Sequence, residues 1–115
     1  MKLDKSFLTG STSMLILKLL DEKDMYGYQM IEELSRKSND IFHLKAGTLY
    51  PLLHNLEQQG MIDSYDKIAD NAKTRKYYAI TGSGKKAFAD KKAEWKVYAK
   101  AVDKVLKGGV TLATN

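Results

Sequence analysis

The sequence predicts a mainly α-helical domain with one β-hairpin and a long C-terminal helix, and three observations carry this prediction. Apolar residues recur at helical spacing in three stretches before Gly60. Two short runs rich in β-branched and aromatic residues follow, separated by the sequence DNAK. Helical spacing then returns after Thr81 and continues to about Leu106.

The composition is that of one globular domain. The chain has 115 residues, no cysteine and a formal net charge of +5, which excludes disulfides and thiolate chemistry and fits the cytoplasm. The positive excess suits a polyanion such as DNA, RNA or an acidic membrane, although a solvated lysine-rich surface is the alternative. The apolar run from Met14 to Leu20 is broken by Lys18 and is too short to cross a membrane.

The first helix is expected to be capped by Ser11 or Thr12 and to run to about Asp21. Its apolar residues cover nearly the whole circumference, so the helix must be covered on more than one side. We expect the cover to come from the C-terminal helix or from a second subunit.

The second helix is expected within residues 24–38, with Met30, Ile31 and Leu34 on one face. Glycine is unfavourable inside a helix. Gly27 therefore indicates either the start of the helix or a close approach of another part of the chain.

The third helix lies within residues 45–58 and contains Pro51, the only proline in the chain. If the helix begins at Thr48, Pro51 lies in the first turn, where its missing N–H is harmless. If the helix begins near Lys45, Pro51 lies inside the helix and must bend it. The residues alone leave both alternatives open.

The hairpin is expected over residues 61–69 and 74–81, with Asp70 and Asn71 taking the positive φ angles of its tip. Neighbouring Tyr77 and Tyr78 must point to opposite faces. One should lie in the core, and the other against the helix or on a phosphate.

The fourth helix is expected to be capped around Thr81 or Ser83 and to end at Gly108-Gly109. Phe88, Trp95 and Val102 are seven residues apart, although Lys91 interrupts the seam. This heptad spacing predicts a dimer, and the alternative is an amphipathic helix that packs within its own chain. The expected dimer-interface residues are Phe88, Trp95, Tyr98, Val102 and Val105.

Three helices followed by a hairpin is the order of a winged helix-turn-helix, in which the third helix enters the DNA major groove. We therefore expect a DNA-binding domain over residues 1–82, a dimerisation helix over 83–107 and a flexible tail over 108–115. The expected DNA-binding residues are Lys45, Thr48, Tyr50, Pro51, His54, Asn55, Lys67, Lys73, Arg75 and Lys76.

The stretches YGYQMIEEL, GTLYPLLHNLEQQGMI and RKYYAITGSGKKAF together resemble the PadR family of bacterial transcriptional regulators, over about residues 8 to 106. The resemblance implies a homodimeric DNA-binding regulator, a repressor on a pseudo-palindromic operator. The family often has Ser-Pro where Lys45-Ala46 stand, which implies an early helix start and a bend at Pro51. Many family wings have glycine or proline at the tip, whereas Asp70 here would repel a phosphate.

The short chain resembles the compact subgroup of that family, whose members sense small molecules. This resemblance implies a site for a flat aromatic effector near Trp95, and the alternative is that Trp95 is only interface core. The residues implied for this site are Phe7, Met14, Leu17, Trp95, Tyr98 and Ala99.

The sequence carries no sign of an enzyme or a cofactor. It has no cysteine nucleophile, phosphate-binding glycine loop or nucleophile elbow, and its two histidines, His43 and His54, have no metal-ligand spacing. The remaining alternative is a winged-helix protein–protein adaptor without sequence-specific DNA binding. Salt dependence separates the two, because DNA affinity falls steeply with salt.

Overall fold

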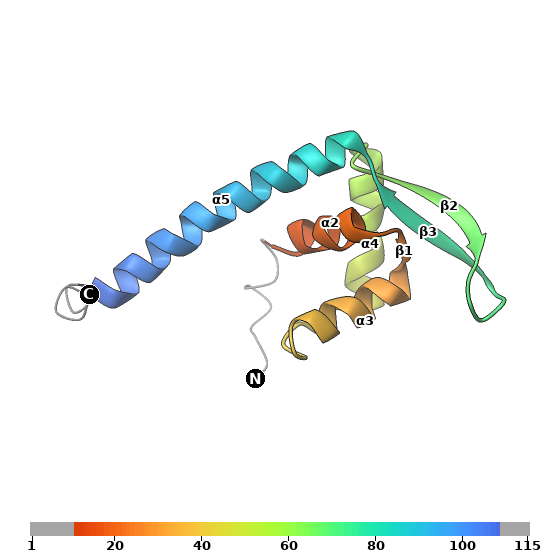
Figure 1. Cartoon of the computed structure of the whole chain (residues 1–115), viewed down its shortest axis with the longest axis horizontal. Coiled ribbons are helices and arrows are strands. Elements are labelled where there is room, and N and C mark those ends of the chain that lie inside the picture. Colours follow the sequence, from red (N-terminus) through yellow and green to blue (C-terminus); the bar gives the residue numbers. More distant parts are fainter. Residues whose placement is uncertain (1–10, 109–115) are drawn as a thin grey trace.

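The computed structural model describes residues 11–108 (Figure 1). Phe7 and nearly all of the expected tail over 108–115 lie outside the described residues. The described helices are α2 (Thr12–Glu22), α3 (Gly27–Lys37), α4 (Ala46–Gln58) and α5 (Gly82–Lys107), and the strands are β1 (Met25–Tyr26), β2 (Ile62–Ile68) and β3 (Thr74–Ile80). This is the expected mainly helical fold with a hairpin and a long last helix.

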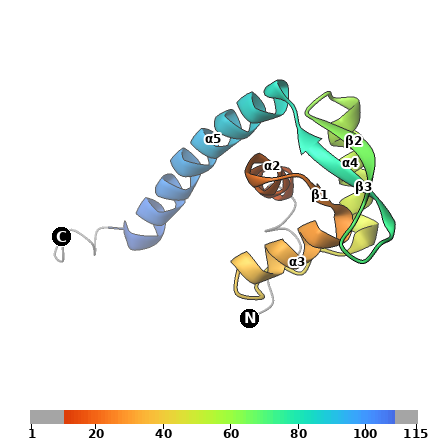
Figure 2. The same ribbon diagram turned by 45° about the vertical axis from the view of Figure 1, so that its right-hand side comes forward.

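Helix α2 is the centre of the molecule. It lies between α3 on one side and α5 on the other (Figures 1 and 2). Leu17 and Ile16 on α2 are completely buried, and so are Leu49 and Leu53 on α4. Burial of each such side chain contributes about 1.5–3 kcal/mol. The expectation that the C-terminal helix covers a second side of the first helix is confirmed, because α5 packs along α2.

The sheet has three antiparallel strands in the order β1-β3-β2. The hairpin register pairs Tyr65 with Tyr77 and Lys67 with Arg75. The short strand β1 was not predicted, and it pairs Met25 with Tyr78 and Tyr26 with Tyr77. A strand of two residues has no alternation that a sequence pattern can reveal.

Both explanations offered for Gly27 hold. The residue is the first of α3. A Cβ atom built on it would overlap the hydroxyl of Tyr50 and lie 2.7 Å from Cζ of the same ring. The absence of a side chain therefore lets α4 lie close to the start of α3.

Helix α4 begins at Ala46, with Lys45 as its N-cap residue. The early start is therefore correct and the alternative start at Thr48 is wrong. Pro51 lies inside the helix, where it offers no N–H to the carbonyl of Gly47 four residues earlier.

The tip of the hairpin differs from the prediction. Positive φ occurs at Ala72 (64°), and neither Asp70 nor Asn71 adopts it. The side-chain oxygen of Asn71 instead accepts a hydrogen bond from the Lys73 N–H at 3.2 Å. This hydrogen bond to the Asn71 side chain stabilises the turn. The left-handed residue is Ala72, which lies between the two hydrogen-bonded residues.

Helix α5 is joined to the domain by a compact junction. The Thr81 hydroxyl accepts from the Gly84 N–H at 3.0 Å and donates to the Gly60 carbonyl at 2.7 Å. The Thr81 N–H donates to the Met61 carbonyl at 3.0 Å. The predicted cap at Thr81 is confirmed, and the same residue ties α5 to the turn between α4 and β2.

Replacing Gly84 with alanine should destabilise the protein, because the new Cβ would overlap the Met61 carbonyl oxygen and lie 2.7 Å from Cγ1 of Ile80. We expect Gly84→Ala to lower the free energy of unfolding by about 1–3 kcal/mol, the usual cost of overpacking. Gly82→Ala is the matched control, since a Cβ at Gly82 meets nothing within 4 Å. Urea denaturation measures both, and equal stability of the two variants would contradict the tight junction.

Candidate nucleic-acid interface

One face of α4 is exposed. Gly47, Pro51, His54 and Gln58 form a row along this face, because residues three and four apart lie on the same side of a helix. The opposite face packs into the core through Leu49, Leu53 and Leu56. The burial of one face thus determines which side chains α4 offers to a partner.

The structure places most of the residues expected to contact DNA on this surface. Lys45, Thr48, Pro51, His54 and Asn55 are all exposed at the start of α4 or along it. Tyr50 is 48% exposed. Its ring is held against the start of α3, where its hydroxyl occupies the space left by Gly27.

The expected wing cations come from both strands of the hairpin and from its tip. Lys67, Lys73 and Lys76 are exposed, whereas Arg75 is half-buried. The guanidinium carbon of Arg75 lies 5.4 Å from the centroid of the Tyr26 ring. Cation–π packing of this kind engages the side chain within its own domain. Among the described residues, the Arg75 Nε is the buried side-chain nitrogen or oxygen that has no hydrogen-bond partner.

A cluster of three tyrosines supports one face of the wing, and sequence reasoning missed it. The ring of Tyr77 stacks on Tyr65 at 5.8 Å and meets the edge of Tyr26 at 5.4 Å. The Lys67 ammonium lies 5.1 Å from the Tyr77 centroid. The Tyr65 hydroxyl donates to the Asp24 carboxylate, and this hydrogen bond raises the pKa of Tyr65 above its ordinary value. These partners are far apart in sequence, so no local pattern reveals the cluster.

The expectation for Tyr77 and Tyr78 is half right. They do point to opposite faces, and Tyr78 belongs to the core, where burial raises the pKa of its hydroxyl. Tyr77 is also buried, at 8% exposure. It lies in the tyrosine cluster, so it reaches neither the helix nor a phosphate.

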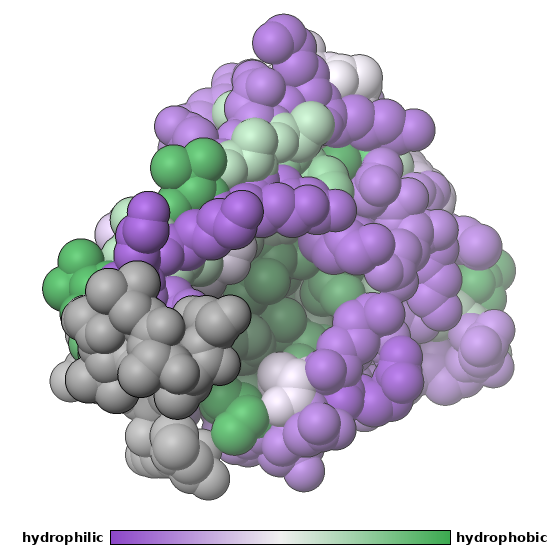
Figure 3. Space-filling model, turned by 60° about the vertical axis from the view of Figure 1, so that its left-hand side comes forward, coloured by the Kyte–Doolittle hydropathy of each residue, from purple (hydrophilic) through white to green (hydrophobic). Residues whose placement is uncertain are grey.

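A second surface feature is a hollow between α2 and α5, with a volume of about 760 Å³. Figure 3 shows hydrophobic surface recessed between hydrophilic ridges on the side where α5 ends. The rings of Trp95 and Tyr98 lie 5.8 Å apart at an angle of 35°. Of the residues expected at an effector site, Met14, Trp95, Tyr98 and Ala99 line the hollow. Leu17 is fully buried in the core and does not.

The expected interface residues divide along α5. Phe88 packs partly against the core of its own chain. Trp95, Tyr98, Val102 and Val105 remain exposed, by 38% to 79% of their surface. The sequence analysis missed Leu106, which is 80% exposed; its spacing of seven from Ala99 is the signal that places it beside the seam.

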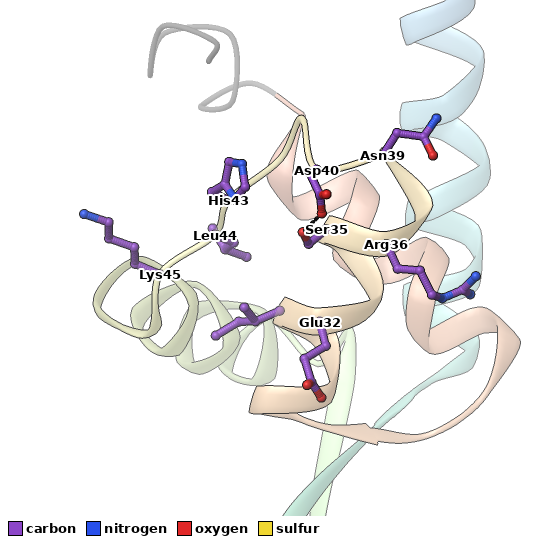
Figure 4. Close-up of a pocket in the computed structure, with 9 residues that line it drawn as sticks. Glu32, Ser35, Arg36, Asn39, Asp40, His43, Leu44 and Lys45 are labelled. Carbon is purple, nitrogen blue, oxygen red and sulfur yellow. Dashed lines mark hydrogen bonds between the residues drawn. The ribbon is translucent and has the colours of Figure 1, made fainter. Parts of the chain in front are cut away.

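A groove of about 600 Å³ lies beside the start of α4, at the C-terminal end of α3 (Figure 4). The Ser35 hydroxyl donates to Asp40 at 2.9 Å across the loop that follows α3. Figure 4 shows Glu32, Arg36 and Lys45 pointing away from one another. Since these polar groups do not converge, the groove lacks the arrangement that holds a small ligand.

Residues 11–108 contain neither a candidate metal site nor a membrane-spanning helix. No three His, Cys, Asp or Glu side chains in this range are grouped so that they could hold a metal ion. No helix in this range is long and apolar enough to cross a membrane.

Comparisons with known proteins agree on one family. Residues 16–90 match the model of the transcriptional regulator PadR-like family. A transcriptional regulator from Clostridium thermocellum is 34% identical with a TM-score of 0.78, and the match covers 86% of this chain and 96% of that one. A PadR family regulator from Eggerthella lenta is 33% identical with a TM-score of 0.77, and the match covers 90% of this chain and 88% of that one.

A third relative is the transcriptional regulator Rv3488 of Mycobacterium tuberculosis. It is 29% identical over 86 residues, which cover 75% of this chain and 77% of that protein. PadR family members are transcriptional regulators and not enzymes. The buried face of α4, the hairpin beside it and these matches lead to one conclusion: the chain belongs to the PadR-like family of transcriptional regulators.

Proposed function

We propose that the protein is a cytoplasmic repressor that binds a pseudo-palindromic operator as a homodimer and is released by a small planar effector. The observation that carries the proposal is the exposed face of α4, the second helix of the helix-turn-helix, which presents His54, Asn55 and Gln58. In this division of labour, residues 1–82 bind DNA and residues 83–107 hold two subunits together.

The reading contacts are assigned to the middle of α4. His54 and Asn55 are exposed there, and both side chains can hydrogen-bond to base edges. The exposed wing lysines Lys67, Lys73 and Lys76 then meet the neighbouring phosphates, which position the domain without reading sequence. Arg75 contributes less to DNA binding than the sequence alone suggests, because its guanidinium packs on Tyr26.

Removing the His54 side chain should weaken operator binding. We expect His54→Ala to reduce affinity for the operator by roughly 5- to 150-fold, the range for one good base contact. His43→Ala is the matched control, because His43 is also exposed but lies outside α4. The measurement is fluorescence anisotropy on a labelled fragment from upstream of the protein's own gene, with excess nonspecific competitor.

If His54→Ala binds as tightly as the wild type, the assignment of the reading face is wrong. A salt series separates DNA binding from the adaptor alternative, since contacts to phosphate weaken steeply with salt. Wild-type binding that does not respond to salt would favour the adaptor.

The dimer is proposed from the uncovered part of α5. Tyr98 is 62% exposed and Leu106 is 80% exposed, on the same apolar face as Trp95 and Val102. A face of this kind on a soluble protein is typical of an interface. Two copies of α5 packed through it would bury these side chains and leave the lysine-rich face in water.

A charge placed in this face should separate the subunits. We expect Val102→Lys to shift the protein from twice the 13.0 kDa chain mass to the monomer mass, since burying an unpaired ammonium is costly. Val97→Lys is the matched control, because Val97 is 71% exposed and points away from the seam. Light scattering at micromolar concentration measures the mass, and a monomeric wild type would exclude the dimer.

The effector is assigned to the hollow between α2 and α5. Its volume of about 760 Å³ is in the range of small-molecule sites. Trp95 and Tyr98 offer two aromatic faces. The charged residues that line the hollow are Lys91, Glu94 and Asp103, two acidic and one basic. These groups suit a planar aromatic compound that carries a positive charge. Binding there would change how α5 lies on α2, and so shift the population away from the DNA-binding form.

Planar aromatic cations should quench the fluorescence of Trp95, the only tryptophan in the chain. The titration is expected to saturate, and Glu94→Gln should weaken it because the carboxylate faces the bound charge. Asp90→Asn is the matched control, since Asp90 does not line the hollow. A flat response across a broad panel of such compounds would count against an effector site here.

A further inference from the structure

The whole positive excess of the protein lies on α5. This helix has eight lysines and three carboxylates, a net charge of +5. The whole chain has 19 basic and 14 acidic residues, also a net charge of +5. The remainder of the chain therefore has 11 of each and is neutral, so the charge is concentrated away from the reading helix and the wing.

Four of the lysines form a ridge along α5. Lys92, Lys96, Lys100 and Lys104 follow one another at intervals of four residues and are all exposed. Side chains at this interval lie one above the other on a single side of a helix. The ridge starts beside the apolar face, since the Lys92 ammonium lies 5.8 Å from the Phe88 ring centroid, and each later lysine lies about 40° further round the helix from that face.

The ridge is not neutralised within the chain. The acidic residues Asp90 and Asp103 of α5 pair with Lys86 and Lys107, at 3.5 and 3.0 Å. In the described part of the chain no ion pair involves a ridge lysine. Like charges four residues apart destabilise a helix, so the ridge opposes helix stability and a bound polyanion would relieve this repulsion.

The ridge also lies on a different helix from α4, which is proposed to read the operator. Helix α5 lies on the opposite side of α2 from α3 (Figures 1 and 2), and the four ridge lysines are exposed on it. In the proposed dimer the apolar faces of the two α5 helices are covered, and both ridges stay in solvent. The ridge is therefore free to bind while α4 occupies the operator.

We propose that the lysine ridge binds the phosphate backbone of a second segment of duplex DNA, so that one dimer bridges two segments. This inference rests on the proposed function, which places the protein on DNA, where phosphate is the polyanion at hand. Lysines act as point charges and do not provide the bidentate geometry that reads bases, so the contact is independent of sequence. A membrane fits less well, because a helix lying in a bilayer interface needs its apolar face beside its basic one, and part of that face covers α2.

The first test measures how binding to a random-sequence duplex depends on salt. The ridge variant carries Lys96→Gln, Lys100→Gln and Lys104→Gln, and it keeps Lys92, whose ammonium lies 5.8 Å from the Phe88 ring centroid. We expect the slope of log affinity against log salt to fall by about 2.7, since each phosphate contact contributes about 0.9. Glutamine has nearly the helix propensity of lysine, and circular dichroism confirms that α5 is intact.

Two control variants make this test specific. Lys18→Gln, Lys23→Gln and Lys37→Gln change the net charge equally but lie on α2, α3 and the link between them, and the slope should stay within one unit of wild type. Arginine at the three ridge positions keeps the charge and should retain the wild-type slope. An unchanged slope in the glutamine ridge variant overturns the inference alone. Absence of any duplex binding by the wild type at low salt overturns the proposed function as well.

The second test asks directly for bridging. Protein loaded on a bead-bound duplex should capture a second, fluorescent duplex of unrelated sequence. The glutamine ridge variant, loaded to the same density, should lose this capture by at least tenfold. Equal capture by both proteins excludes the ridge as the second site. Binding to phosphatidylserine vesicles that depends on the ridge, with no loss of duplex capture, would reassign it to a membrane.

Discussion

The architecture depends on the contact between the first turn of α5 and the turn that joins α4 to β2. Thr81 caps α5 and bonds to the Gly60 carbonyl with the same hydroxyl. Gly84 lies so close to the Met61 carbonyl that no side chain fits between them. The direction of α5 is therefore set by backbone atoms in the turn that follows α4. The hollow beside Trp95 and the exposed apolar face both follow from this direction.

Helix α5 changes character along its length. Near its start, Gly84 and Phe88 pack against the domain, whereas Tyr98 and Leu106 are left in solvent. The packing of an internal amphipathic helix thus applies to the first part of α5, and the proposed dimer seam would use the later, uncovered part. A helix of 26 residues is about 39 Å long at 1.5 Å per residue, and the small core covers only part of it.

The sequence predicted the features that depend on local spacing. The leucines of α4 define its buried face. Thr81 is recognisable as a cap because a threonine hydroxyl at the start of a helix can accept a hydrogen bond from the N–H three residues later, here that of Gly84. The features that were missed depend on distant partners. Strand β1 exists because Met25 and Tyr26 meet β3, and the tyrosine cluster joins residues from three strands. The start of α4 was left open by the residues themselves, because proline is tolerated in a first turn and also, at a cost, in a helix interior.

The junction at Gly60 has a mechanical consequence. Thr81 joins the start of α5 to the turn after α4 through two hydrogen bonds, one from its hydroxyl and one from its N–H, so a small tilt of α4 would turn α5 about Thr81. For a rigid arm about 39 Å long, a rotation of roughly 5° displaces the far end by about 3 Å. Helix α5 would thus amplify a small rotation at its N-cap into a larger displacement at its C-terminal end, near Leu106. A displacement of this size would change the contacts that the side chains at that end make.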